Sequence, residues 1–253
     1  MFGVMQVGFI GAGNMARALA RGWGEPVLCT DSGSGRAQAL VDELGGEAVA
    51  SNRELAERAD LVILAHKPAQ LDDIAAEAVG AKAVASVLAR TSLADVRAAY
   101  PGAQAFRVMP NTPVELRSGA IAFAQCDEDT DPDLYARIRE RFERIGTVVE
   151  VPEKLMGVAG ACAGVGPAYW ALLVEAQVDA AVRRGLPAAL ASTLVVETMA
   201  GSAELLRARG GDTFAVRREV TSPGGTTAQG LAALERGGVR AAFASAMDDV
   251  VGG

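Results

Sequence analysis

The feature that most constrains the fold of this chain is a glycine-rich turn between a β-rich run and a helical run. Val4 to Ile10 is predicted to be a strand, and Gly11-Ala12-Gly13 follows it directly and leads into an Ala-rich helix that ends near Trp23. In this G-x-G-x-x-A pattern the first glycine permits a tight turn, the second lets the backbone approach a pyrophosphate, and Ala16 lets the helix pack closely on the strand. The pattern predicts a dinucleotide-binding βαβ unit, with the phosphates at the positive end of the helix.

The first part of the chain alternates β-rich runs with helical patterns. Further strands are predicted at Pro26–Thr30, Leu61–Ala65, Ala83–Leu88, Ala105–Met109, Gly119–Phe123 and Thr147–Val151, with helices at Arg36–Leu44 and from a capping box at Ser51 and Glu54. Strands separated by helices of this length predict βαβ units and a mainly parallel sheet.

From Lys154 to Val251 the pattern is helical, and it breaks where glycine, proline and polar turn residues cluster. The breaks are Gly164–Pro167, Gly185–Pro187, Gly210–Asp212, Ser222–Gly225 and Gly237–Gly238. The predicted fold class is therefore α/β, with an N-terminal Rossmann-type doubly wound sheet over residues 1–152 and a C-terminal all-helical domain over residues 153–253. A helical block this apolar is expected to complete its core against a second copy, as a dimerisation domain.

Composition limits the class of partner. Half of the 253 residues are apolar and the net charge is −7, which excludes a mainly disordered chain and, without a basic cluster, argues against nucleic acid. The three cysteines, Cys29, Cys126 and Cys162, are far apart in the sequence, and His66 is the only histidine. We therefore expect no metal site, and we expect a reduced, cytoplasmic location. The uncharged run between Lys154 and Glu175 is interrupted by proline and glycines, which favours closely packed buried helix over a membrane span.

Asp31 follows the second predicted strand, about twenty residues past the glycine turn, where an acid binds the adenosine ribose hydroxyls of NADH. Ser32, Ser34 and Arg36 come next, and hydroxyls with a guanidinium suit the 2′-phosphate of NADPH. A solvated turn after a strand is a third interpretation. The preference between NADPH and NADH stays open on these residues.

Three further segments contain residues that would cost the fold stability unless they served a function. His66-Lys67-Pro68 follows a strand at its carboxyl end, where ligands bind in open α/β sheets, and Met109 to Pro113 ends another strand with a rigid loop. Thr221 to Thr227 precedes a helix, and its glycines and hydroxyls expose backbone N–H groups that suit a carboxylate.

These segments together resemble the pyrroline-5-carboxylate reductase family. The shared motifs are GFIGAGNMA, KP, RVMPNTP, GPAY followed by Glu175-Ala176, and SPGGTT, in the same order from Gly8 to about Met247. The resemblance implies a Rossmann domain with a helical dimerisation domain, a homodimer that often assembles further, and reduction of Δ1-pyrroline-5-carboxylate to L-proline with NADPH or NADH. That reaction is the last step of proline biosynthesis.

The resemblance and the fingerprint also imply roles for individual residues. Cofactor contacts are expected at Gly11, Ala12, Gly13, Asn14, Met15, Asp31, Ser32, Arg36, Lys67, Pro68, Asn111 and Thr112. Substrate contacts are expected at Ser222, Gly224, Gly225, Thr226, Thr227 and Glu175, and the catalytic candidates are Thr227, beside the ring nitrogen, and Lys67. Two departures from the family pattern are Arg90 in place of a glycine and Ala163-Gly164-Val165 in place of a segment with two hydroxyls.

Several alternatives stay open. His66 is either a general acid or a polar loop residue, Lys67 is either at the nicotinamide or solvated, and Glu175 either faces a partner or the dimer's active site or caps a buried network. The reaction could also be that of another imine reductase or of a 3-hydroxyacid reductase of this architecture. A 3-hydroxyacid reductase would be expected to carry a catalytic lysine in the first long helix of the second domain, and the sequence from Lys154 to Val182 contains no lysine after Lys154. A non-catalytic dinucleotide-binding regulator is a third alternative.

Overall fold

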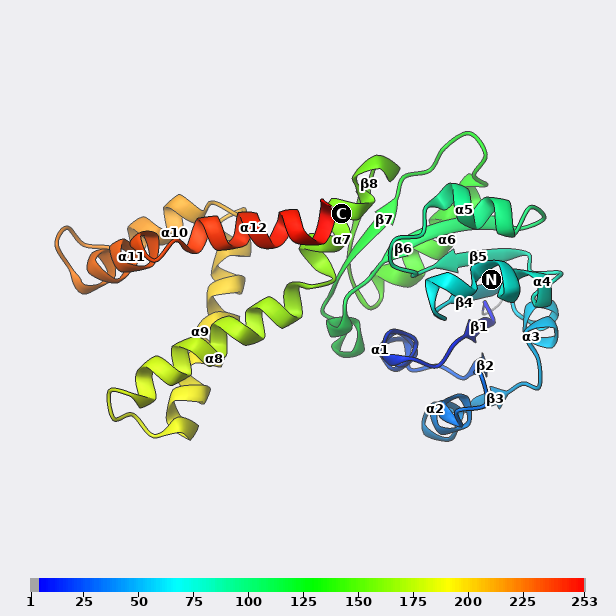
Figure 1. The fold of residues 1–253 in the computed structure, drawn as a ribbon, viewed down its shortest axis with the longest axis horizontal. Helices are drawn as coiled ribbons and strands as arrows, with labels where there is room; N and C mark the ends of the chain where they lie inside the picture. The colour runs from blue at the N-terminus through cyan, green and yellow to red at the C-terminus, as the bar shows by residue number, and fades with distance from the viewer. Residues whose placement is uncertain (1–4, 253) are drawn as a thin grey trace. The chain divides into compact units, whose positions relative to one another are not determined.

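The computed structural model describes residues 5–252, and the chain divides into two compact units, Met1–Pro167 and Ala168–Gly253. Strands and helices alternate along the first unit, whereas the second contains helices alone (Figure 1). Val4, the first residue of the first predicted strand, lies outside the described residues.

The first unit is built on one eight-stranded sheet. Its strands are β1 Val7–Ile10, β2 Val27–Thr30, β3 Gly46–Ala48, β4 Leu61–Leu64, β5 Ala83–Ser86, β6 Gln104–Met109, β7 Gly119–Ala124 and β8 Gly146–Val151. The order is β3-β2-β1-β4-β5-β6-β7-β8, and among the described strands the antiparallel pairing is that of β6 with β7. The first six strands have the doubly wound order of a Rossmann fold, so the predicted fold class is confirmed for this unit.

Helices cover both faces of the sheet. They are α1 Asn14–Trp23, α2 Arg36–Leu44, α3 Asn52–Arg58, α4 Leu71–Glu77, α5 Leu93–Ala99, α6 Pro132–Glu143 and α7 Met156–Ala163, with short 3-10 helices η1 Pro68–Gln70, η2 Thr112–Leu116 and η3 Glu153–Leu155. One buried cluster joins α1, α2 and α6 to the sheet, and a second joins α3, α4 and α5 to it. The central strands β1 and β4 are buried along their whole length, which explains their continuous apolar sequence.

Aromatic packing fixes α1 on the sheet. The ring of Trp23, at the end of α1, lies 5.9 Å from that of Phe9 on β1 and 5.4 Å from that of Phe142 on α6. Its indole N–H donates to the carbonyl of Arg141 at 3.0 Å, and the Arg141 guanidinium lies 4.7 Å from the ring centroid. The glycine turn that precedes α1 is therefore held between two fixed elements, a buried strand and a helix anchored at its far end.

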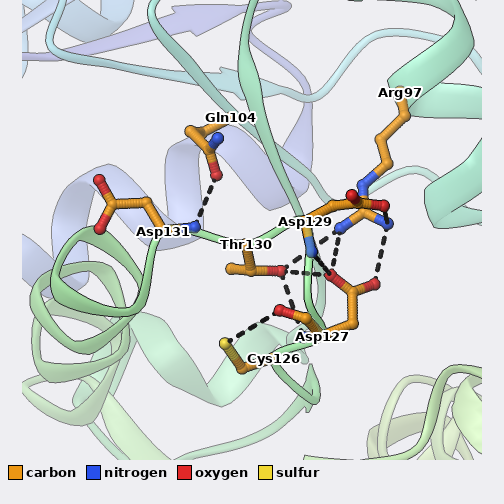
Figure 2. Close-up of polar contacts among 7 residues, drawn as sticks. All are labelled: Arg97, Gln104, Cys126, Asp127, Asp129, Thr130 and Asp131. Atoms are coloured by element: carbon orange, nitrogen blue, oxygen red, sulfur yellow. Dashed lines mark hydrogen bonds and ion pairs between the residues drawn. The ribbon is translucent and has the colours of Figure 1, made fainter.

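The loop from β7 to α6 is held by a polar cluster (Figure 2). The Asp127 carboxylate accepts two hydrogen bonds from Arg97 on α5, at 2.7 and 2.8 Å, and a third from the Thr130 hydroxyl at 2.7 Å. The bond from Arg97 lowers the pKa of Asp127 to about 2. Asp131 then caps α6, while its own N–H donates to the side chain of Gln104 at 2.9 Å. Because the polar groups of the loop are paired with one another and with Arg97 and Gln104, the cluster is structural.

The second unit is helical throughout, as predicted. Its helices are α8 Gly166–Val182, which runs on from the first unit, α9 Ala188–Ala208, α10 Thr213–Glu219, α11 Thr226–Arg236 and α12 Val239–Val251. Four of the predicted breaks fall between two of these helices, since glycine, proline and short polar residues interrupt the helical hydrogen bonding there. The remaining one, Gly164–Pro167, lies at the junction of α7 and α8, and α8 already begins at Gly166. The rings of Tyr169 and Phe243 pack edge to face with centroids 6.3 Å apart.

Apolar side chains of α8 and α9 are exposed in the single chain. Trp170 and Leu172 on α8 are 54% and 63% exposed, and Leu194 on α9 is 60% exposed. Residues Glu153–Val182 and Ala188–Ala208 are long and apolar enough to span a membrane by length and composition, yet only 17% and 6% of their most apolar windows is buried. The prediction of closely packed buried helix is therefore wrong for α8 within one chain, where its apolar side chains are largely exposed.

The two units meet farther along the chain than the predicted boundary at Pro152. Met156 at the start of α7 packs with Ala122 and Ala124 of β7, so α7 belongs to the first unit. The limits 1–152 and 153–253 follow the change in secondary structure, and as domain limits they stay a prediction.

Candidate cofactor and substrate sites

The glycine turn has the geometry that its sequence predicts. Gly11 has φ +101°, and a Cβ there would lie 2.7 Å from the carbonyl oxygen of Ala65, so only glycine fits. Its N–H donates to the carbonyl of Thr30 at 3.0 Å, which ties the turn to the end of β2. Ala16 is fully buried, consistent with close packing of α1 on the sheet. The turn thus brings the carboxyl ends of β1, β2 and β4 together.

The N-terminus of α1 is open beyond this turn. Gly13 is the N-cap, and a Cβ at Gly13 would meet no described atom within 4 Å. No side chain of the described residues caps the helix, so its first backbone N–H groups are free to bind an anion. Asn14 is exposed and Met15 is half-buried beside this end, while Ala12 is buried. These residues can hold a diphosphate.

Asp31 makes four hydrogen bonds within its own turn. Its carboxylate accepts from the N–H groups of Gly33, Arg36 and Ala37 at 2.8, 2.7 and 3.0 Å and from the Ser34 hydroxyl at 2.8 Å. Partial burial raises the pKa of Asp31, but the bonds from Ala37, Ser34, Gly33 and Arg36 together lower it further than burial raises it. Asp31 is thus an ionised cap of α2.

A cavity of about 430 Å³ adjoins Asp31. It is lined by Thr30, Asp31, Val49, Ala50, Ser51, Asn52, Arg53, Ala76 and Glu77. The amide of Asn52 accepts from the Thr30 hydroxyl at 2.6 Å and donates to Glu77 at 2.7 Å, which fixes its orientation. The cavity lies at the ends of β2 and β3, where the adenosine half of a dinucleotide is bound in this type of fold. Sequence reasoning missed Asn52, Arg53 and Glu77; the signal that could have found Asn52 is its place directly after the capping residue Ser51, at the start of α3.

His66 and Lys67 lie at the end of β4, as predicted. The Nδ1 of His66 lies 2.9 Å from the carbonyl oxygen of Lys67, so Nδ1 carries the ring proton. Burial lowers the pKa of His66, although the contact with Lys67 raises it, so the ring is neutral at pH 7. A neutral ring with its proton held by a carbonyl favours the polar-loop interpretation over the general acid. Lys67 and Pro68 are exposed at this edge.

Asn111 is a buried structural residue of the loop after β6. Its side chain donates to the carbonyl of Ala163 on α7 at 3.2 Å and accepts from the N–H of Ala120 on β7 at 2.9 Å. Thr112, which begins η2, is exposed beside it. Arg90 is exposed and has φ +59°, the left-handed region in which the family's glycine is favoured.

The predicted substrate segment lies in the second unit. Gly224 has φ +70°, Gly225 is the N-cap of α11, and a Cβ at Gly225 would lie 2.4 Å from the Ser222 hydroxyl. No described side chain caps α11, so its first N–H groups are unpaired within the helix. Ser222 and Thr226 are exposed and Thr227 is half-buried.

Glu175 is exposed on α8 and makes no hydrogen bond with a described residue, so the structure does not bear out a buried network around it within one chain. The roles of Glu175, Thr227, Lys67 and the other site residues stay predictions.

Two family models match the chain. Residues 153–252 match "Pyrroline-5-carboxylate reductase dimerisation", and residues 6–90 match "NADP oxidoreductase coenzyme F420-dependent". Among distant solved structures, a Mycobacterium tuberculosis 3-hydroxyisobutyrate dehydrogenase has a TM-score of 0.52 at 17% identity, and a reductive aminase from Aspergillus terreus in complex with NADPH has 0.56 at 16%. At these identities the likeness shows a shared fold alone.

Similarity to named reductases extends over nearly the whole chain. A pyrroline-5-carboxylate reductase from Synechocystis sp. is 36% identical, covering 96% of this chain and 94% of the relative, and one from Methanosarcina acetivorans is 34% identical with the same coverage. The solved enzyme from Streptococcus pyogenes has a TM-score of 0.88 at 29% identity, covering 98% of this chain and 96% of that one. The enzyme from Plasmodium falciparum, with NADP bound, has a TM-score of 0.86 at 26% identity, covering 98% and 95%. The chain belongs to the pyrroline-5-carboxylate reductase family.

Proposed function

We propose that this chain transfers a hydride from NADPH or NADH to the C=N bond of 1-pyrroline-5-carboxylate and so forms L-proline. The observation that carries the proposal is the uncapped N-terminus of α11 behind Ser222–Thr227, in a chain 36% identical to a named pyrroline-5-carboxylate reductase over 96% of its length. The enzyme is an NAD(P)H-dependent oxidoreductase acting on a C=N bond, in the biosynthesis of an amino acid.

The cofactor fits the first unit. The space in front of the Gly13 Cα is open and leaves room for a diphosphate against the first N–H groups of α1. The cavity beside Asp31 and Asn52 has room for the adenosine. When bound, the reduced nicotinamide supplies the hydride. Lys67 and Pro68, exposed at the end of β4, and Asn111 with the exposed Thr112, at the end of β6, border the nicotinamide. The two side-chain bonds of Asn111 fix the loop after β6.

The second unit orients the substrate. The free N–H groups of α11 hold the carboxylate, since a helix N-terminus favours an anion. An iminium nitrogen already carries positive charge, so the adjacent carbon accepts hydride without an acid to hold an oxyanion, and alignment alone contributes on the order of 7–11 kcal/mol. Thr227 hydrogen-bonds the nitrogen as it becomes an amine.

The exposed apolar faces of α8 and α9 pack against a second copy. The match of residues 153–252 to a dimerisation model supports a homo-oligomer built from dimers. Charged residues along these helices, such as Glu175, Asp179, Glu197 and Glu204, argue against lipid as the cover. An acidic, soluble homodimer in the cytoplasm is the state we propose, without nucleic acid or membrane as a partner.

Purified protein supplied with 1-pyrroline-5-carboxylate is expected to oxidise NADPH or NADH, read as loss of absorbance by the reduced nicotinamide, with proline as the product by mass spectrometry. No turnover with either cofactor would reject the proposed reaction and favour a non-catalytic dinucleotide-binding protein.

Thr227→Val removes the hydroxyl and keeps the shape, so kcat/KM should fall about tenfold or more, as expected for one lost hydrogen bond in the transition state. Thr227→Ser should restore most of the loss. Thr213→Val, at the start of α10, is the matched control and should change nothing. Equal kcat/KM for Thr227→Val and the wild type would remove Thr227 from the site.

Gly13→Ala and Gly11→Ala separate cofactor binding from folding. At Gly13 the added methyl meets no described atom, so the free energy of unfolding should change by less than about 1 kcal/mol while the Kd for the cofactor rises at least about tenfold. At Gly11 the same change should destabilise the fold by about 1–3 kcal/mol, through the positive φ and the contact with Ala65. Denaturant unfolding and cofactor titration give both quantities, and unchanged cofactor affinity in Gly13→Ala would contradict the assignment.

The double variant Leu172→Glu and Leu194→Glu should dissociate the oligomer, because each leucine is more than half exposed in one chain and would be buried against its copy. Sedimentation velocity measures the change. Leu116→Glu is the control, since Leu116 is 79% exposed in the first unit. A wild-type monomer, or an oligomer that survives the double substitution, would show that these faces are not the interface.

A further inference from the structure

We propose that Asp31 makes this chain selective for NADH over NADPH, because its carboxylate occupies the place in which a 2′-phosphate would have to be held. The inference rests on the proposed function for the identity of the cofactor, and it decides between the two cofactors that the sequence leaves open. The solved relative from Plasmodium falciparum has NADP bound, so any selectivity against the phosphate must come from residues of this chain.

The donors that could bind a phosphate here already have an acceptor. Backbone N–H groups at a helix N-terminus and a nearby hydroxyl are the groups that hold phosphates in proteins. At the start of α2 these groups are the N–H of Gly33, Arg36 and Ala37 and the hydroxyl of Ser34, and all four donate to Asp31 at 2.7 to 3.0 Å. The carboxylate thus stands in for the anion.

One oxygen of Asp31 still has room for a donor. Oδ2 accepts three of the bonds, whereas Oδ1 accepts only the one from Gly33 among the described residues. A carboxylate oxygen has two lone pairs, so Oδ1 can accept a further bond from a ribose hydroxyl. The 2′-hydroxyl of NADH supplies that donor. The 2′-phosphate of NADPH is ionised near neutral pH and brings only acceptors and negative charge.

The cavity beside Asp31 also favours a ribose with a free 2′-hydroxyl over one that carries a phosphate. Its charged lining residues are Asp31 and Glu77, which are acidic, and Arg53, which is basic. The Asn52 amide is not free to turn toward a phosphate, because it donates to Glu77 and accepts from Thr30. A hydroxylated ribose therefore meets less repulsion here than a phosphorylated one.

Arg36 and Ser32 are the residues that could oppose this selectivity. Both side chains are exposed next to Asp31, and a guanidinium can bind a phosphate. However, the backbone N–H of Arg36 donates to the Asp31 carboxylate at 2.7 Å, so a phosphate could use the guanidinium but not this N–H.

The test compares NADH with NADPH in the full-length protein, by titration of reduced-nicotinamide fluorescence without substrate and by kcat/KM with 1-pyrroline-5-carboxylate. The variants are Asp31→Asn, which keeps an oxygen to cap α2, and Asp31→Ser, which frees the donors. Asp42→Asn is the matched control, because Asp42 lies on the same helix and accepts a bond from Gln38 at 2.7 Å instead. Thermal unfolding shows whether each variant is folded.

We expect the wild type to bind NADH at least tenfold more tightly than NADPH, and both Asp31 variants to reduce that ratio at least tenfold, with Asp42→Asn unchanged. Wild-type preference for NADPH, equal affinities, or a ratio that folded Asp31 variants preserve would overturn the inference. Selective NADH binding without reduction of the imine would refute the proposed function and leave the selectivity in place, so the two failures are distinguishable.

Discussion

The close approach of the Gly11 turn to the end of β4 is the constraint on which the cofactor half of this protein depends. The carbonyl of Ala65 leaves no room for a side chain, and the N–H of Gly11 is bonded to the end of β2. Three strand ends therefore meet at one turn. The start of α1, the Asp31 turn and the His66–Pro68 segment are brought to one edge of the sheet as a consequence, and Trp23 holds α1 in place from its other end.

The second unit follows a different physical rule, since its helices expose apolar side chains that a stable chain would normally bury. Trp170, Leu172 and Leu194 lie on long helices with few partners within the same chain. Such surfaces indicate that the folded unit is larger than one polypeptide. The proposed substrate segment Ser222–Thr227 belongs to this same unit, so the proposed substrate binding and the proposed association both involve the helical unit.

Much of the fold and of the cofactor site could be predicted from the sequence, and the features that could not be predicted have physical reasons. The glycine turn and the helix breaks follow from local rules, because φ at Gly11 and the lack of a donor in proline act within a few residues. The doubly wound sheet was predicted from the alternation of strands and helices behind the dinucleotide fingerprint. β3 was missed because Gly46–Ala48 is a short strand with little apolar content. The bonds of Asn111 to α7 and β7 join residues far apart in the chain, and no local pattern reveals them. Asp31 had three interpretations because which donors reach its oxygens depends on the path of the turn after it.

The packing of α7 has a consequence for how the protein could be divided. Met156 covers Ala122 and Ala124 of β7, and the carbonyl of Ala163 holds the side chain of Asn111. A fragment cut after Pro152 would lose both contacts, leaving an apolar face of β7 open to water and the loop after β6 without one of its two anchors. An autonomously folding nucleotide-binding fragment of this chain must therefore retain the first helix of the region that matches the dimerisation family.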